Sequence, residues 1–432
     1  MAGRLNVFQR TMLLWNELHP YNAVHVVEVP SVLQIERLQE IVAKTIEYHK
    51  LTGLKIDSEA GTYHYHGGEF EQRIATVSNE GEPTGALKNE IRKQLNRKFD
   101  LGDKATPFRF FALPMESSFF LGVSYFHAVA GAESIVLLMQ SVVGSYIENN
   151  GKTLPLPMDI YPPTYRGWLC RHPGVLFRKL LNLPSLILKL KDSMRLRYKD
   201  EMDVENGFEL FSLTSLQLNM LLLASKSWGI TLNDLFLALL LKVFEPLREH
   251  RVYSSRRRQF SVGTIVNLRR DMEVDSHKTF GLFLGSFVVT HEVPEDISLR
   301  SLATDVREQT KVIKKQRRYM GSSIDLLSAQ RSLRFLNMER KKKFYQKHYP
   351  LWGGITNMNL NSIWSQTDEA NPVDYMRAVS TGPATPLVLS ITTVRDIVNI
   401  GMSYRTTVFS EADIEFIRTR FLELVQQIQE EA

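Results

Sequence analysis

Apolar and polar positions along this chain follow two different periods. Short runs rich in β-branched and aromatic residues, such as residues 23–29 (AVHVVEV) and 119–126 (FFLGVSYF), predict buried strands. Elsewhere apolar residues recur every three or four positions, as in residues 133–146, which predicts helices with one buried face. Because the two kinds of segment are interleaved throughout, the sequence predicts a fold that mixes sheets and helices.

The same patterns place the remaining elements. Ser31 and Thr231 are of a residue type that begins helices, and each precedes a helical pattern. The predicted strands are 23–29, 62–66, 119–126, 208–213, 260–266, 354–357 and 387–393, and a resemblance to a known family adds strands at 280–290 and 399–406. The predicted helices are 8–15, 31–49, 86–97, 133–146, 216–229, 235–244, 298–318 and 411–430.

The chain has 432 residues, more than one typical hydrophobic core accommodates. A proline-rich stretch at residues 154–163 predicts a linker. We therefore expect an N-terminal lobe over residues 1–165, a linker with a basic amphipathic helical region over 166–206, and a C-terminal lobe over 207–432.

His127 is the candidate for chemistry. It follows the predicted strand at 119–126 and precedes a run of small residues, Ala128, Ala130, Gly131 and Ala132. Small residues beside a strand end allow another surface to approach closely, and histidine is the side chain whose ordinary pKa suits proton transfer near neutral pH. A histidine buried in the core and satisfied there would give the same local pattern.

Composition narrows the possible functions. The hydrophobic content of 44% and charged content of 23% are those of an ordinary globular protein. The beginning of the sequence, MAGRLNVFQR, lacks the apolar core of a signal peptide, so we expect a cytoplasmic protein. Cys170 is the only cysteine, which excludes an internal disulfide and a cysteine zinc cluster. His64 and His66 share one strand face, but no third metal ligand lies near them in the sequence.

The net charge of +6 favours anionic partners without selecting one. Residues 171–200 form a basic amphipathic region that can contact an anionic membrane surface, and a helix packed on the protein has the same pattern. A second basic stretch includes Arg331, Arg334 and residues 340–347. It fits an acidic carrier protein or the phosphates of coenzyme A, or it is simply solvated. Nucleic acid is not expected, because no binding module accompanies the charge.

His127 and the residues after it resemble the HHxxxDG motif of the condensation-domain superfamily, the acyltransferases related to chloramphenicol acetyltransferase. Further segments resemble the family in the family's order: FQR near Phe8, FDL…P.R from Phe99, TLND from Thr231, NLR at Arg269, FG…G.F from Phe280, and SYRTTVFS near the end. The resemblance covers essentially the whole chain. It implies an α/β (α+β) fold of two similar lobes, each a mixed sheet packed on helices, forming a V with a central tunnel at His127.

The motif departs from the family at three positions. Phe126 replaces the first histidine, Gly131 replaces the aspartate, and Ala132 replaces the final glycine. In relatives the aspartate pairs with an arginine and shapes the active-site loop, and Arg269 is similar to that arginine. The resemblance therefore implies that Glu133 or Asp271 substitutes for the aspartate, or that packing alone holds the loop.

The resemblance implies an acyltransferase in which His127 is the general base. The acyl donor would be a thioester of coenzyme A or of a carrier protein, and the acceptor an alcohol or an amine. Asn357 is a candidate for oxyanion or substrate contact, and neither a metal nor a redox cofactor is implied. The alternative is an inactive condensation-like module that docks a carrier protein or a partner enzyme.

Overall fold

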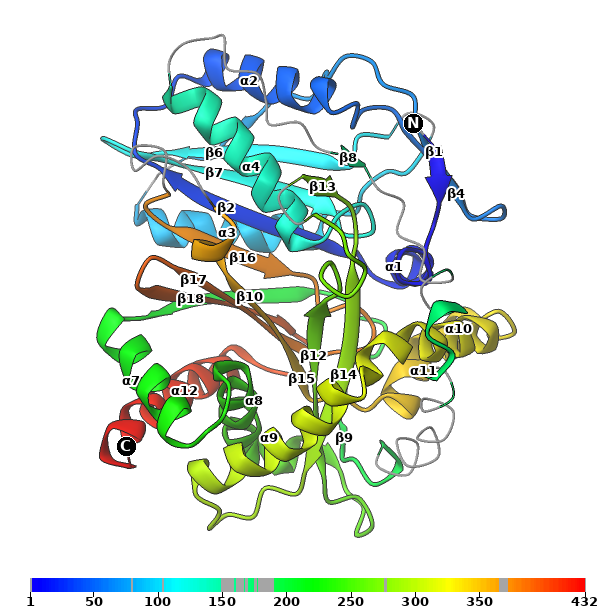
Figure 1. Cartoon of the computed structure of the whole chain (residues 1–432), viewed down its shortest axis with the longest axis vertical. Helices are drawn as coiled ribbons and strands as arrows, with labels where there is room; N and C mark the ends of the chain where they lie inside the picture. The colour runs from blue at the N-terminus through cyan, green and yellow to red at the C-terminus, as the bar shows by residue number, and fades with distance from the viewer. Residues whose placement is uncertain are drawn as a thin grey trace.

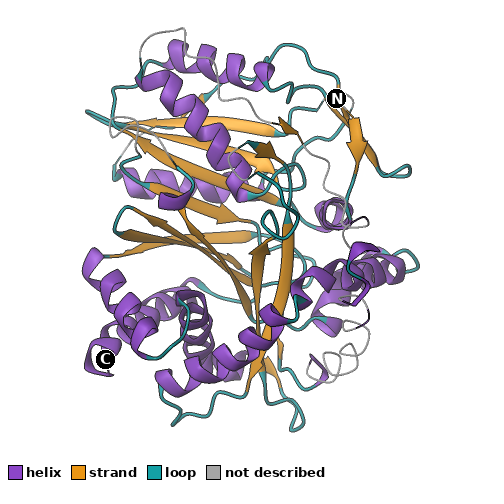
Figure 2. Ribbon diagram, viewed as in Figure 1, coloured by secondary structure: helices purple, strands orange, loops and turns teal. Residues whose placement is uncertain are grey.

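The computed structural model describes residues 2–78, 81–102, 105–148, 190–275, 278–364 and 372–431, together with single positions and short pieces between 159 and 177. These residues form two lobes, each built on a mixed β-sheet with helices against it (Figures 1 and 2). The predicted fold of two sheet-and-helix lobes is therefore confirmed.

The N-terminal lobe contains a five-stranded sheet in the order β16-β2-β7-β6-β5. The strands are β2 (Asn22–Val29), β5 (Ala75–Thr76), β6 (Phe108–Pro114), β7 (Phe119–Phe126) and β16 (Tyr375–Val379). All neighbouring pairs are antiparallel except β5 and β6. Every residue of β7 is buried, as its continuous apolar run predicts for a central strand.

The alternation of side chains in β2 divides this lobe into two layers. Val24 and Val26 pack with Leu87 and Ile91 of α3 (Pro83–Asn96). On the opposite side lie α2 (Ile35–Tyr48) and α4 (Ala132–Ile147), which contact each other (Figure 1). Because successive side chains of a strand point to opposite faces, His25 lies on the face away from α3.

The C-terminal lobe contains a six-stranded sheet in the order β10-β18-β17-β15-β12-β14. Its strands are β10 (Asn206–Leu213), β12 (Phe260–Asn267), β14 (Leu284–His291), β15 (Gly353–Asn359), β17 (Leu387–Val394) and β18 (Ile397–Arg405). Its helices are α7 (Ser215–Ser227), α8 (Leu232–Phe244), α9 (Leu299–Lys315) and α12 (Glu411–Glu431). Thr231 caps α8 as predicted: its hydroxyl accepts from the backbone of Asp234, and the carboxylate of Asp234 accepts from the backbone N–H of Thr231.

Shorter elements complete the described chain. They are β1 (Ala2–Arg4), β3 (Leu54–Asp57), β4 (Thr62–Tyr65), β8 (Asp159–Ile160), β9 (Arg195–Leu196), β11 (Arg251–Val252) and β13 (Thr279–Phe280), with helices α1 (Val7–Leu18), α10 (Ser322–Leu333) and α11 (Met338–His348). Three short 3₁₀ segments lie at Glu245–His250, Arg318–Gly321 and Leu360–Ser362.

One strand crosses from the C-terminal part of the chain to the N-terminal sheet, so that sheet does not follow the expected division at residue 206. Strand β16, from the C-terminal part of the chain, completes the N-terminal sheet by pairing with β2. Strand β13 pairs with β8. These long-range pairings are not encoded in local periodicity, and they join the lobes into one structure.

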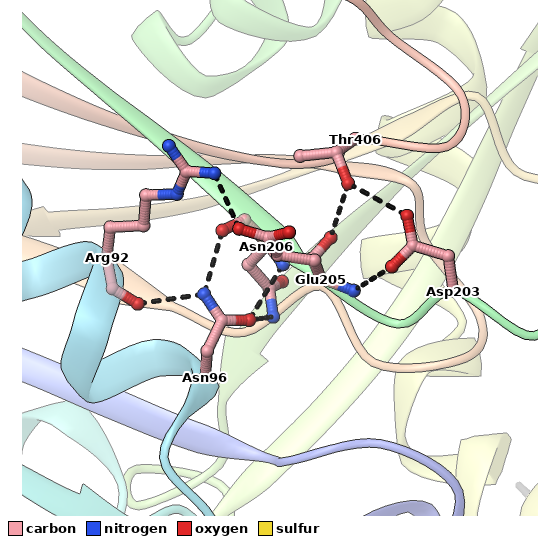
Figure 3. A network of polar contacts seen from close by, with 6 residues as sticks. All are labelled: Arg92, Asn96, Asp203, Glu205, Asn206 and Thr406. Atoms are coloured by element: carbon pink, nitrogen blue, oxygen red, sulfur yellow. Dashed lines mark hydrogen bonds and ion pairs between the residues drawn. The ribbon is translucent and has the colours of Figure 1, made fainter.

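Asn206 anchors a polar network where the lobes meet (Figure 3). Its backbone N–H donates to Oδ1 of Asn96 at the end of α3 (2.8 Å), and its carbonyl accepts from Nδ2 of Asn96 (2.9 Å). Beside it, Arg92 of α3 forms an ion pair with Glu205 (2.5 Å). The side-chain oxygen of Asn206 accepts from the backbone N–H of Thr381, just after β16. This one residue therefore holds α3, the start of β10 and the end of β16 together.

Several predicted bounds differ from the structure. The helix predicted over 298–318 ends at Lys315, because Arg317 is in the left-handed region. Helix α2 begins at Ile35 with Gln34 as its N-cap rather than at Ser31. Tyr146 causes the difference, because its hydroxyl donates to the carbonyl of Val32 and accepts from the backbone N–H of Gln34, which holds this segment in a non-helical path. The strand expected over residues 280–290 is divided into β13 and β14. Between them the carbonyl of Gly281 accepts from the backbone N–H of Gly131 and from Ser134 at the start of α4.

Candidate functional site

His127 lies at the end of β7, directly after the buried strand. Its backbone N–H donates to the carbonyl of Tyr21 (3.2 Å). The Tyr21 ring stacks on the imidazole with centroids 5.5 Å apart, and the Tyr125 ring meets it edge-on at 5.8 Å. Two aromatic rings and a main-chain hydrogen bond thus fix the position of the imidazole.

The tautomer of His127 follows from its hydrogen bond. Nδ1 lies 3.2 Å from the carbonyl oxygen of Ala130, which can only accept, so Nδ1 carries the proton and Nε2 presents a lone pair. Burial lowers the pKa of His127 from 6.5 to about 4. The imidazole is therefore neutral near pH 7, in the form that can accept a proton at Nε2.

A cavity of about 580 Å³ reaches His127. Residues from both lobes line it, from β2 and β16 of the N-terminal sheet and from β12, β14 and β15 of the C-terminal sheet. Most of the lining is apolar or aromatic. The polar part of the lining includes Thr356, Ser380, Thr381, Thr385 and Ser390, and the charged residues Glu308, Arg318, Asp325 and Arg377 also belong to the lining. Its size and its lining are typical of a site for a small organic molecule.

Side chains of three adjacent strands share the sheet face that carries His127. Strand register places Ala23 between Tyr125 and Val379, and places His25 beside Arg377. His25 also contacts two hydroxyls, those of Tyr375 (2.7 Å from Nδ1) and Tyr125 (3.4 Å from Nε2). The N-terminal sheet thus supplies the cavity with one row of ionisable and aromatic groups.

Glu133 forms an ion pair with Arg269. Its carboxylate lies 3.0 Å from Nε of Arg269, and it also accepts from Nδ2 of Asn267. The side chain of Arg269 is almost completely buried and donates further to the carbonyl of Thr279 (2.7 Å) and to Oγ of Ser134 (2.6 Å). The sequence left three partners for Arg269 open: Glu133, Asp271, or no carboxylate at all. In the structure the partner is Glu133.

Gly131 is the N-cap of α4, and it has room for a side chain. A Cβ atom at this position would lie 3.6 Å from the carbonyl oxygen of Gly281, an ordinary contact. Gly131 therefore contacts the backbone of the opposite lobe, at Gly281, and contributes no acidic side chain there. The acidic residue nearest to it in the sequence is Glu133, in the first turn of α4.

Ser134 is a site residue that the sequence analysis did not identify. Its hydroxyl donates to the carbonyl of Gly281 (2.9 Å) and accepts from the backbone N–H of Gly281 (2.9 Å) and from Arg269. Nothing in the sequence distinguishes this buried serine from other serines in helices. Only the approach of residues 279–281 to α4 gives it this role.

Two candidate residues are not where the predicted roles require them. Asn357 is exposed on β15 and is absent from the cavity lining, whereas its neighbour Thr356 belongs to the lining. The alternation of the strand explains this difference, so Asn357 does not fit a contact with an oxyanion. Asp271 is not the partner of Arg269: it accepts from the hydroxyl of Tyr319 and lies 3.7 Å from Arg317.

Other sequence candidates lie away from the cavity. The rings of His64 and His66 are 4.2 Å apart at exposed positions, and the described residues contain no group of three or more ligands that could hold a metal ion. The middle of the basic region 171–200, residues 178–189, lies outside the described residues. In the part of the chain that the structure describes, no helix is both long and apolar enough to cross a membrane.

Comparison with known proteins finds relatives by structure alone. No family model and no curated protein matches the sequence. The first condensation domain of the CDA synthetase superposes with a TM-score of 0.72 at 14% identity, over 99% of this chain and 96% of that one. The condensation domain from the monacolin K polyketide synthase MokA superposes with a TM-score of 0.68 at 10% identity, over 99% of this chain and 98% of that one.

A third similar structure is the X-domain from teicoplanin biosynthesis, with a TM-score of 0.62 at 13% identity over 99% of this chain and 95% of that one. At such identities the likeness concerns the fold, and it extends over the full length of both chains. The order of the sequence motifs and the two-lobed structure agree with it. This chain has the fold of the condensation domains, and its His127 lines a cavity to which both lobes contribute.

Proposed function

We propose that this protein transfers an acyl group from a thioester to an alcohol or an amine, with His127 as the general base. One observation carries the proposal: the protonated Nδ1 of His127 is bound to Ala130, which leaves Nε2 as a neutral base beside a cavity that both lobes line. The depressed pKa of His127 keeps this base unprotonated at neutral pH.

The proposed reaction needs one residue to move a proton twice. Nε2 of His127 removes the proton from the acceptor hydroxyl or amine as the oxygen or nitrogen attacks the thioester carbonyl. The tetrahedral intermediate then expels the thiolate, which takes the proton from the imidazolium. An ester or amide and a free thiol are formed, and His127 returns to its neutral state. Holding both substrates in the cavity supplies much of the rate enhancement.

We further propose that the donor is presented by a carrier protein at the outer end of α10. Phe335 is 88% exposed there and directly follows Arg334, which is exposed like Arg331, and Arg340 is five residues further along the sequence. An exposed aromatic ring among arginines matches an acidic partner that adds some apolar contact. Free coenzyme A would need only the phosphate contacts.

A transfer assay read by mass spectrometry tests the proposed reaction. The protein is incubated with acyl thioesters on coenzyme A and on carrier proteins, and with alcohols and amines. His127→Ala is run beside His66→Ala, a matched change at an exposed histidine. We expect product from the wild type and from His66→Ala, and a loss of about 10²–10⁴-fold in His127→Ala. Equal turnover in His127→Ala would refute the role of the base.

The competing function is a binding module without catalysis. It is favoured by one comparison, since the X-domain from teicoplanin biosynthesis is also known in a complex with OxyB, at a TM-score of 0.60 to this chain. If no donor and acceptor pair gives product while a carrier protein binds at Phe335, the binding module becomes the better reading.

A further inference from the structure

Arg377 carries a buried charge at the polar part of the cavity lining. It is 4% exposed, and it belongs to the lining together with its neighbours Thr356, Ser380 and Ser390. Burial lowers the pKa of its guanidinium to about 10, so the group remains a cation near neutral pH. A cation in such a place is costly unless an anion accompanies it.

No described residue supplies that anion. Nε of Arg377 donates to the hydroxyl of Thr392 (2.8 Å), and Nη2 donates to the carbonyls of Thr356 (3.1 Å) and Ile391 (2.5 Å). All three acceptors are neutral, and they use three of the five N–H groups of a guanidinium. The two on Nη1 have no acceptor within the described part of the chain, and no carboxylate there pairs with Arg377.

A second buried arginine shows how the fold satisfies such a group when no ligand is involved. Arg109 donates from Nε to Gln94, from Nη1 to the carbonyl of Lys98 and from Nη2 to the carbonyl of Arg97. Its guanidinium also stacks 3.7 Å above the ring of Phe99. Arg109 has an acceptor on each nitrogen and does not line the cavity, whereas Arg377 lines the cavity and leaves Nη1 open.

Arg377 and His127 lie on the same face of one sheet. Arg377 is opposite His25, and His25 is opposite Val123, four residues before His127 on β7. On ordinary sheet spacings the two Cα atoms are offset by about 13 Å along the strands and about 10 Å across them. A molecule with its reacting group at His127 can therefore place an anionic group at Arg377 several bonds away, with its apolar part along the cavity wall.

We propose that Nη1 of Arg377 binds the carboxylate of a substrate whose body is apolar and whose reacting group reaches His127. This inference rests on the proposed acyl transfer, because it names the substrate class of the same cavity. The carboxylate belongs either to the acyl chain or to the acceptor. The lining has one other arginine, Arg318, which is less buried than Arg377 and donates from Nε to the side chain of Gln316 (2.7 Å).

Calorimetric titration of the full chain with octanoate and with octanamide near neutral pH tests the inference. The two ligands differ in charge and share their apolar tail. We expect wild-type protein to bind octanoate at least tenfold more tightly than octanamide, as a charge-assisted hydrogen bond in a buried site would give. Equal affinities, or no binding of octanoate, would overturn the inference.

Variants locate the effect. In Arg377→Gln we expect the preference to fall to within about twofold while octanamide affinity is unchanged, and in the matched Arg318→Gln we expect it to persist. If Arg377→Gln does not fold, Arg377→Lys serves in its place, since the shorter ammonium cannot keep the three anchors and also reach the ligand. A full preference in Arg377→Gln or Arg377→Lys would overturn the inference.

The binding measurement also separates this inference from the proposed reaction. His127→Ala is expected to keep the preference for octanoate, because binding needs no proton transfer. If the protein transfers acyl groups but binds octanoate and octanamide equally, only the inference about Arg377 is overturned. If it prefers octanoate but transfers no acyl group, only the proposed reaction is overturned. The transfer assay identifies which substrate carries the carboxylate. Thioesters with and without a terminal carboxylate test the donor, and hydroxy acids compared with plain alcohols test the acceptor. The carboxylate-bearing substrate is the one whose turnover falls in Arg377→Gln.

Discussion

Glu133 and Arg269 form an ion pair of 3.0 Å that joins the first turn of α4 to the chain after β12, and so joins the two lobes beside His127. Arg269 is buried, and its other donors bind Thr279 and Ser134. The pair also places a negative charge in the first turn of a helix, where the dipole favours it. The segment that follows His127 is therefore held to the other lobe by a charge contact, although residue 131 itself is a glycine.

Removal of this carboxylate should destabilise the protein. Glu133→Gln leaves a buried guanidinium without its anion, so we expect a loss of about 3 kcal/mol in the free energy of unfolding. Denaturant titration measures it. A change below about 0.5 kcal/mol would show that the two hydrogen bonds of Arg269 suffice without the carboxylate.

Gly131→Asp should restore part of that loss. The position accepts a Cβ atom, it is the N-cap of α4, and Asp is a favourable N-cap. In the Glu133→Gln background we expect a gain of about 1–2 kcal/mol, and in the wild type a smaller one, because Arg269 already has its anion. A double-mutant cycle gives the coupling, and additive effects would show that residue 131 does not reach Arg269.

The pH dependence of transfer should follow His127. Burial lowers its pKa from 6.5 to about 4, so the neutral base is present above that value. We expect kcat/KM to be level from about pH 5 upward and to fall as the pH drops through about 4. A profile that falls near pH 6.5 would mean that the imidazole is not desolvated in the free protein.

Stability should fall at a higher pH than activity does. Burial lowers the pKa of His19 to about 3 and that of His49 to about 4, below the value of 6.5 that applies when the chain is unfolded. Between those values the unfolded chain binds more protons, so the free energy of unfolding decreases as the pH falls below 6.5. Thermal unfolding between pH 7 and pH 4 checks the direction, and a flat or rising melting temperature would contradict it.

Gly401→Ala should disturb the junction of the two sheets. A Cβ atom at Gly401 of β18 would lie 2.1 Å from the backbone oxygen of Arg377 on β16, and backbone cannot move aside. We expect a loss of about 3 kcal/mol or more in unfolding free energy. The control is Gly85→Ala in α3, where no atom lies within 4 Å of the new Cβ and the change should be neutral or stabilising by up to about 1 kcal/mol.

Donor presentation can be tested by charge reversal. We expect Arg334→Glu to lower kcat/KM about tenfold, ~1.4 kcal/mol, with a carrier-protein thioester and to leave the coenzyme A thioester unaffected. Lys226→Glu, at an exposed position of α7, is the matched control and should change neither. Equal losses with both donors would mean that Arg334 acts on the phosphopantetheine arm, which coenzyme A and carrier proteins share, and would contradict a carrier-protein contact.

Local patterns in the sequence determined much of this protein. The continuous apolar run of β7 predicted a central strand, the period of residues 133–146 predicted α4, and Thr231 predicted a helix start, because these depend on side-chain spacing and on capping within a few residues. The order of motifs identified the fold and singled out His127. It also offered Glu133 as a substitute for the motif aspartate.

Tertiary structure alone decided how these parts meet. Arg269 pairs with Glu133 rather than with Asp271, and Ser134 binds Gly281, through contacts between residues more than a hundred positions apart. Arg377 is buried in the cavity lining because strand β16 crosses to the other lobe. Periodicity shows which face of an element is apolar, but not which distant element covers it. The placement of Asn357 outside the cavity has the same cause: a strand fixes alternation locally, while the side on which the cavity opens is set by the packing of two sheets.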